Sequence, residues 1–168
     1  MLKRLLPVLF FAGISTAVFA DHSVTLHSPD GNLQLGLLHR SNGDLVYKVF
    51  FKGKTVVAPS GLGMRLKSPE VSLLQFDLLG IDSSVTDETW KPVWGEVSQI
   101  RNNYKQLLVK LADRSGSGIQ LQIIFKVFND GIGFRYSFPQ QTKLNHFIIG
   151  EELSQFAMSG DHKAFWIP

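Results

Sequence analysis

One short segment of the 168-residue chain gathers most of the side chains that could bind a ligand. Residues 86–96 read Thr-Asp-Glu-Thr-Trp-Lys-Pro-Val-Trp-Gly-Glu, and residues 101–103 add Arg-Asn-Asn. In an extended chain Trp90 and Trp94 would share one side, because side chains alternate along a strand. Flat apolar rings beside planar polar groups suit a sugar, which offers one apolar face and a rim of hydroxyls. Core packing of the tryptophans is the alternative. We therefore predict a carbohydrate-binding surface made of Glu88, Trp90, Trp94, Glu96, Arg101 and Asn102.

The carboxylates of this segment also raise the question of catalysis. Glycoside hydrolysis requires an acid paired with a base or nucleophile across the scissile bond. Asp87 and Glu88 are neighbours, so in a strand they point to opposite faces and do not converge on one atom. We predict no catalytic residue in this chain. A stand-alone enzyme that uses Asp87, Glu88 or Glu96 is the weakest of the hypotheses that we carry.

Metal ligation and the common nucleophile motifs find little support in the sequence. The chain has no cysteine, which excludes disulfides, thiolate zinc sites and a cysteine nucleophile. None of the five histidines stands in a zinc spacing, and no nucleophile elbow or phosphate loop is present. Glu151-Glu152 and Asp87-Glu88 could offer oxygen to calcium, but they lack an ordered loop spacing. Asp161-His162 favours a turn with a buried imidazole hydrogen bond over a base or a metal ligand. We therefore predict no metal site.

The elements that must position these side chains are predicted to be strands. Asn129-Asp130-Gly131 favours a hairpin turn, and Pro139 ends the strand that follows it. Residues 144–157 could place apolar side chains along a helix, but Gly150 and the Phe-Ile-Ile run favour an extended chain. We predict an all-β fold, an antiparallel β-sandwich whose sheets face each other. Apolar residues alternate with polar ones over 33–37, 45–51, 119–127 and 132–138.

Both ends of the chain carry further expectations. Residues 1–20 have two basic residues, an apolar stretch and a small-residue end, which is typical of a secretory signal peptide; a retained anchor helix is the alternative. Cleavage leaves 15 basic and 14 acidic side chains, so we predict no nucleic-acid partner and no membrane contact. Export without cysteine favours a bacterial periplasm or cell surface. The apolar end at 164–168 predicts that residues 21–168 are the front portion of a longer protein.

Five segments together carry a family resemblance across nearly the whole of 21–168. They are Ser-Pro-Asp-Gly at 28–31, the two-tryptophan segment at 87–96, Ile-Arg-Asn at 100–102, the hairpin at 125–136 and the closing segment at 160–168. In order and spacing they resemble the N-terminal domain of glycoside hydrolase family 97. The resemblance implies a β-sandwich of the galactose-mutarotase-like (super-sandwich) type, here incomplete. It also implies a catalytic (β/α)8 barrel after the sandwich, in secreted, calcium-dependent α-glucosidases and α-galactosidases, mostly of Gram-negative bacteria.

The resemblance also assigns roles to individual residues. It implies that the acid, the base or nucleophile and most calcium ligands belong to the barrel, so that this chain alone binds α-linked oligosaccharide or supports the barrel without cleaving bonds. The alternative is an interaction domain that docks on the barrel and binds no sugar. The family commonly has Trp-Trp where this chain has Phe165-Trp166. The matching positions of sugar-binding or barrel-facing residues are Glu88, Trp90, Trp94, Glu96, Arg101, Asn102, Asp161, His162 and Trp166.

Overall fold

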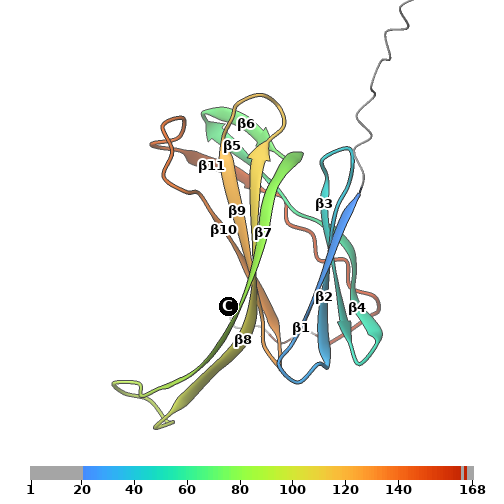
Figure 1. The fold of residues 1–168 in the computed structure, drawn as a ribbon, viewed down its shortest axis with the longest axis vertical. Coiled ribbons are helices and arrows are strands. Elements are labelled where there is room, and N and C mark those ends of the chain that lie inside the picture. Colours follow the sequence, from blue (N-terminus) through green and yellow to red (C-terminus); the bar gives the residue numbers. More distant parts are fainter. Residues whose placement is uncertain (1–20, 164, 166–168) are drawn as a thin grey trace, which may run out of the picture.

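The computed structural model describes residues 21–163 and residue 165. The predicted signal peptide at 1–20 and Trp166 lie outside the described residues. Within them the chain forms strands and no helix, which confirms the all-β prediction (Figure 1). No described segment is a helix that could span a membrane. The strands are β1 (His22–His27), β2 (Leu33–His39), β3 (Leu45–Phe51), β4 (Lys54–Gly61), β5 (Met64–Ser68), β6 (Glu70–Leu73), β7 (Phe76–Trp90), β8 (Ile100–Asp113), β9 (Gln120–Val127), β10 (Ile132–Ser137) and β11 (Ile148–Glu152).

The strands form three antiparallel sheets. The first sheet has the order β1-β2-β3-β4, the second β10-β9-β8-β7 and the third β11-β5-β6. The first and second sheets face each other, as Figure 1 shows. Residues 144–157 contain β11 and no helix, so the extended reading is confirmed.

The core lies between the two four-stranded sheets. Alternating side chains point inward from each strand, as the sequence predicts. Phe125 of β9 is fully buried, and its ring lies 6.2 Å from that of Tyr47 on β3, so aromatic contacts join the two sheets. Other buried members are Leu35, Leu37 and Leu45 from the first sheet and Leu107, Val109, Leu111, Leu121, Ile123 and Val127 from the second.

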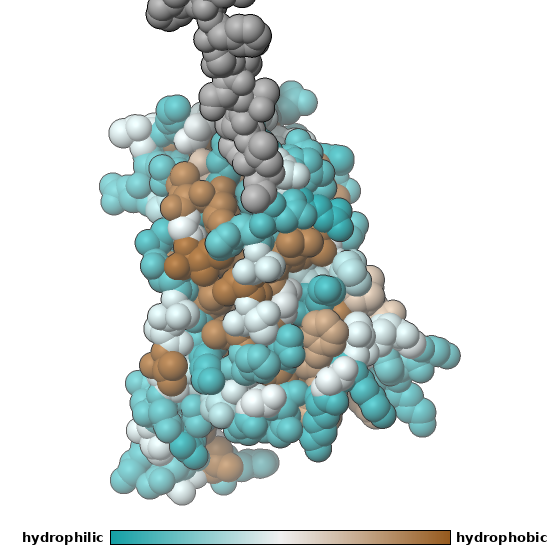
Figure 2. Space-filling view, turned by 45° about the vertical axis from the view of Figure 1, so that its right-hand side comes forward, coloured by the Kyte–Doolittle hydropathy of each residue, from teal (hydrophilic) through white to brown (hydrophobic). Residues whose placement is uncertain are grey.

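One side of the sandwich is only partly closed. β1 and β7 are edge strands of the two sheets. Val24 and Leu26 of β1, and Leu78 and Ile81 of β7, pack against the core while remaining half-buried. Figure 2 shows apolar side chains reaching the surface among hydrophilic ones on the face that it views.

The other edge of the first sheet is covered by residues 153–159. This segment runs along β4, and backbone hydrogen bonds join Ala58 N to Ala157 O at 2.7 Å and Ser159 N to Val56 O at 3.0 Å. The buried Ser60 hydroxyl accepts from Ala157 N at 2.9 Å. Covering an edge in this way removes unpaired backbone groups that would otherwise pair with another chain.

The β8–β9 turn is built around a buried carboxylate. Asp113, which is 5% exposed, accepts hydrogen bonds from the Ser115 hydroxyl, and from the hydroxyl and backbone N–H of Ser117 at 2.6 and 3.3 Å. Burial by itself raises the pKa of Asp113, but these hydrogen bonds outweigh it and the net pKa is lowered from 3.8. Gly116 and Gly118 mark this turn in the sequence, and they adopt positive φ of 95° and 69° in the structure.

Candidate functional site

The predicted sugar-binding residues lie on a hairpin that leaves the body of the sandwich. β9 pairs with β8 only from Lys105 to Ala112, so residues 100–104 of β8 pair with β7 alone. Together with the loop 91–99, this two-stranded ribbon forms what we call the arm, residues 86–104. Figure 1 shows the arm projecting beyond the two sheets. A two-stranded ribbon is marginally stable by itself, so its order depends on the way its base is held.

One face of the arm brings together three of the predicted residues. The register pairs Glu88 with Asn102 and Trp90 with Ile100, and paired residues of antiparallel strands share a face. Asn102 Nδ2 donates to Glu88 Oε1 at 2.9 Å. The Trp90 indole at the end of β7 is 50% exposed. This face, which we call the Trp90 face, thus holds an accessible aromatic ring beside a planar carboxylate–amide pair.

The opposite face of the arm holds an ion pair. Arg101 donates from Nε and Nη2 to the two carboxylate oxygens of Asp87, at 2.8 and 2.7 Å. These hydrogen bonds lower the pKa of Asp87 and raise that of Arg101. Arg101 therefore lies across the ribbon from Asn102, and Asp87 and Glu88 point to opposite faces as the alternation predicts.

The extended chain that would place Trp94 and Glu96 on the side of Trp90 does not continue beyond Trp90. β7 ends at Trp90, and residues 91–99 form a loop. Pro92 has no backbone N–H to continue a ladder, and Gly95 adopts a positive φ of 133°, which turns the chain. Trp94 is 88% exposed at the tip of the arm. Pro92 could have predicted the end of this strand from the sequence, because a proline argues against a continuing strand as well as against a helix.

The base of the arm is held by a cluster that sequence reasoning missed. Tyr104, the last residue of β8 in the arm, is 8% exposed. Its ring lies 5.1 Å from that of Phe128, and Lys126 Nζ lies 4.1 Å from the ring centroid. Hydrogen bonds from Lys126 and then Thr86 lower the pKa of the Tyr104 hydroxyl. The cluster fixes the arm to the second sheet where β9 ends.

Replacing Tyr104 by alanine is expected to loosen the arm and leave the sandwich folded. The substitution removes both ring contacts at the base, whereas the main core of the sandwich lies between the two sheets. Hydrogen exchange of the amides at 86–90 and 100–103 should accelerate about tenfold or more, while that of β8 residues 107–111 stays unchanged. Arg101→Gln is the control, because an exposed ion pair contributes about 0–1 kcal/mol. Equal exchange in the arm of Tyr104→Ala and the parent would contradict this role.

The closing segment follows a different path. Ser159 hydrogen-bonds through its N–H and hydroxyl to the backbone of β4, at Val56 O and Thr55 O. His162 N then donates to Gly160 O at 3.0 Å, so the predicted turn is present. The imidazole of His162 is exposed, so the prediction of a buried ring is wrong. Among the described residues no hydrogen bond or ion pair joins His162 to the arm.

The two carboxylate pairs considered for calcium are otherwise engaged. Asp87 is bound by Arg101, and Glu151 by Arg65 Nη1 at 2.8 Å. Glu88 accepts from Asn102, and Glu152 from the Ser154 hydroxyl at 2.8 Å. No group of three or more metal-ligating side chains lies together in the part of the chain that the structure describes. These residues do not fit a calcium ion, and we derive no step through one.

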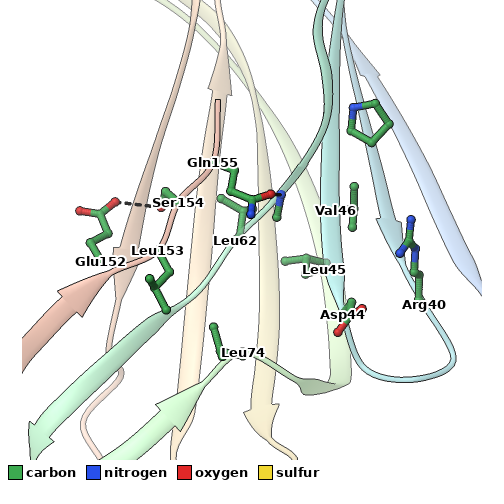
Figure 3. Close-up of a pocket in the computed structure, with 12 residues that line it drawn as sticks. Arg40, Asp44, Leu45, Val46, Leu62, Leu74, Glu152, Leu153, Ser154 and Gln155 are labelled. Atoms are coloured by element: carbon green, nitrogen blue, oxygen red, sulfur yellow. Dashed lines mark hydrogen bonds between the residues drawn. The ribbon is translucent and has the colours of Figure 1, made fainter. Parts of the chain in front are cut away.

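A cavity of about 720 Å3 lies elsewhere, between the first sheet and the segment that follows β11 (Figure 3). Apolar side chains including Leu45, Leu62 and Leu74 line it together with Gln155, whose Oε1 accepts from Gly61 N at 2.9 Å. Figure 3 shows Arg40 and Glu152 on opposite sides of this space. None of the predicted sugar-binding residues that the structure describes lines this cavity, so it does not belong to the Trp90 face.

The chain is similar to parts of several known enzymes. A family model described as glycosyl-hydrolase 97 N-terminal matches residues 26–168. A retaining α-galactosidase of Bacteroides thetaiotaomicron is 27% identical over 164 residues, which are 97% of this chain and 23% of that protein. A family 97 enzyme of Pseudoalteromonas sp. strain K8, solved in complex with panose, superimposes with a TM-score of 0.76 and 32% identity over 86% of this chain. A β-arabinopyranosidase structure matches with a TM-score of 0.72 and 26% identity over 80% of it.

The matched region is a small part of each relative. The chain spans 22% of the Pseudoalteromonas enzyme and 21% of the β-arabinopyranosidase. Because the family model covers most of the chain and the fold agrees with it, the chain belongs to glycoside hydrolase family 97, of which it contains the N-terminal domain.

Proposed function

We propose that this chain is the supporting domain of a secreted α-glycosidase of family 97, and that its Trp90 face contacts α-linked oligosaccharide. The observation that carries the proposal is the Trp90 face itself. A half-exposed indole stands beside a Glu88–Asn102 pair whose free oxygens and N–H can meet sugar hydroxyls. The panose complex of the Pseudoalteromonas relative supports an α-linked oligosaccharide as the ligand class.

The proposal assigns bond cleavage to a catalytic domain, which the resemblance describes as a (β/α)8 barrel with a calcium ion. In this chain the neighbouring carboxylates of the arm lie on opposite faces and are each bound to another side chain. They therefore do not flank one glycosidic bond. Secretion through the signal peptide at 1–20 is part of the same proposal, and it would place the protein in the periplasm or on the cell surface.

Titration with maltooligosaccharides and α-galactosides tests the sugar contact. Binding measured by calorimetry should weaken about tenfold or more in Trp90→Ala, because a stacked ring contributes about 0.5–1.5 kcal/mol beyond the apolar area that it buries, and tenfold is about 1.4 kcal/mol. Trp94→Ala is the matched control, since that indole lies in the loop beyond the strand, and it should bind as the parent does. Binding that Trp90→Ala leaves unchanged would refute the sugar contact. Turnover of aryl α-glucoside or α-galactoside by the purified chain would refute the supporting role.

A docking domain that binds no sugar remains the second candidate, and the arm tip favours it. Val93, Trp94 and Val97 are 99%, 88% and 56% exposed. Exposed apolar residues gathered at one tip are typical of a protein contact. This candidate expects no saturable binding in the parent or in either tryptophan variant, so the same titration separates the two functions.

A further inference from the structure

A groove on the outer face of the second sheet has the features of a separate ligand site. It encloses about 420 Å3 and is lined by Ile124, Lys126, Phe128, Gly133, Phe134 and Arg135. The register pairs Lys126 with Gly133 and Ile124 with Arg135, so residues of β9 and β10 form its floor and walls. The volume lies in the range of small-molecule pockets.

Gly133 is the reason that the groove is open. A Cβ atom placed on Gly133 would meet no atom within 4 Å, and its backbone is not in the left-handed region. Its neighbours on the same face, Lys126 and Arg135, carry long side chains. The missing side chain thus leaves a depression that Lys126 and Arg135 border, with Ile124 and the half-buried Phe128 as apolar surface.

The two cations at the groove lack carboxylate partners. Arg135 is exposed, and Lys126 lies over the Tyr104 ring. No salt bridge of the described residues involves either side chain. No carboxylate lines the groove: on the same face Asp82 is paired with Lys110 Nζ at 2.6 Å, and Glu88, which keeps its negative charge, lies on the arm and accepts from Asn102. The groove therefore carries a local positive charge that an anionic ligand would neutralise.

We propose that this groove binds a hexose-sized ring that bears a carboxylate, as a hexuronic acid does. The apolar floor would receive the C–H face of the ring, and Lys126 and Arg135 would bind the carboxylate through charge-assisted hydrogen bonds. This site contains none of the Trp90, Glu88 and Asn102 side chains, so it does not depend on the function proposed for the arm.

Titration of the chain with methyl α-D-glucuronide and with methyl α-D-glucoside tests the proposal, with the amide signal of Gly133 followed by nuclear magnetic resonance. The two ligands share a ring and differ in the carboxylate. We expect the glucuronide to bind about tenfold more tightly, a difference of about 1.4 kcal/mol, because hydrogen bonds between charged groups are stronger than those to a neutral hydroxymethyl group. Its affinity should also fall as salt is added. Equal affinities for the two ligands, or chemical-shift changes at other residues with none at Gly133, would overturn the proposal.

Paired variants separate the groove from general effects on charge and folding. Arg135→Gln should weaken glucuronide binding about fivefold or more, whereas Lys110→Gln, which removes a cation already paired with Asp82, should leave it unchanged. Gly133→Leu should abolish binding by filling the groove. Gly80→Leu is its control, since Gly80 on β7 also faces open space outside the groove. Thermal melting verifies that each variant is folded.

A protein partner with an acidic segment is the competing occupant. A hexaglutamate peptide should bind more weakly than the glucuronide, because it lacks a ring to cover Ile124 and Phe128. Tighter binding of that peptide at Gly133 would overturn the hexuronate proposal. A folded Gly133→Leu variant that still binds the glucuronide would overturn it as well. Maltooligosaccharide binding at Trp90 is a separate measurement, so either proposal can fail alone.

Discussion

Replacing Phe125 by alanine is expected to lower the free energy of unfolding by about 3–5 kcal/mol. Phe125 is fully buried, and its ring packs against Tyr47 of the facing sheet and Phe134 of the neighbouring strand, with centroid separations of 6.2 and 5.5 Å. The loss includes both the transfer energy of the ring and the cavity left where two sheets meet. The free energy of unfolding of a whole domain is about 5–15 kcal/mol, so this substitution would remove much of the stability.

Denaturant unfolding followed by circular dichroism measures this effect. Phe51→Ala is the matched control, because Phe51 ends β3 with its side chain 41% exposed and should cost well under half as much. Equal losses in the two variants would show that the sheets are not joined through Phe125.

Removing the buried carboxylate of Asp113 is expected to cost about 2–4 kcal/mol. Asp113→Ala leaves the Ser115 and Ser117 hydroxyls and one backbone N–H without their acceptor in the β8–β9 turn. Asp113→Asn keeps the shape and removes the charge, so it should cost less than the alanine variant. The measurement is again the midpoint and slope of denaturant unfolding. A loss below about 0.5 kcal/mol in Asp113→Ala would show that solvent replaces these hydrogen bonds.

The same residue predicts how stability depends on pH. The pKa of Asp113 is lower in the folded protein than its ordinary value of 3.8, so its ionised form favours folding at neutral pH. That stabilisation is present above the unfolded pKa and is lost as the pH falls through the folded pKa. The pKa of Asp30 is lowered as well, chiefly by the Ser28 hydroxyl, and that of Asp87 by Arg101. Below about pH 3.8 the free energy of unfolding of Asp113→Ala should therefore fall less than that of the parent. The part of the fall that is due to Asp30 and Asp87 should remain in the variant.

Much of the sandwich could be predicted because its signals are local. Alternating side chains define the inner and outer faces of β2, β3, β9 and β10, and Asn129-Asp130-Gly131 places the turn between the last two. The physical reason is that side chains alternate with a period of two along a strand, so a one-residue shift of register would exchange its inner and outer faces. The same alternation places Asp87 and Glu88 on opposite faces of the arm.

The candidate site could be predicted only in part. The types of its residues are apparent from sequence, and Glu88, Trp90 and Asn102 do lie on one face. Arg101 lies on the other face because it is adjacent to Asn102, and adjacent residues of a strand point to opposite faces. Trp94 and Glu96 lie in the loop after the strand ends at Trp90, so the alternation does not determine where they point.

The sequence by itself determined which residues point inward on each strand and where the main turns fall, because these depend on neighbours along the chain. Only the tertiary structure decided that β9 stops pairing at Lys105 and leaves the arm free, and that Lys126 comes to lie over the ring of Tyr104. These contacts join residues of different strands, and their register is selected by the packing of the whole core between two sheets. No pattern within a single segment of the sequence specifies which residues of different strands meet.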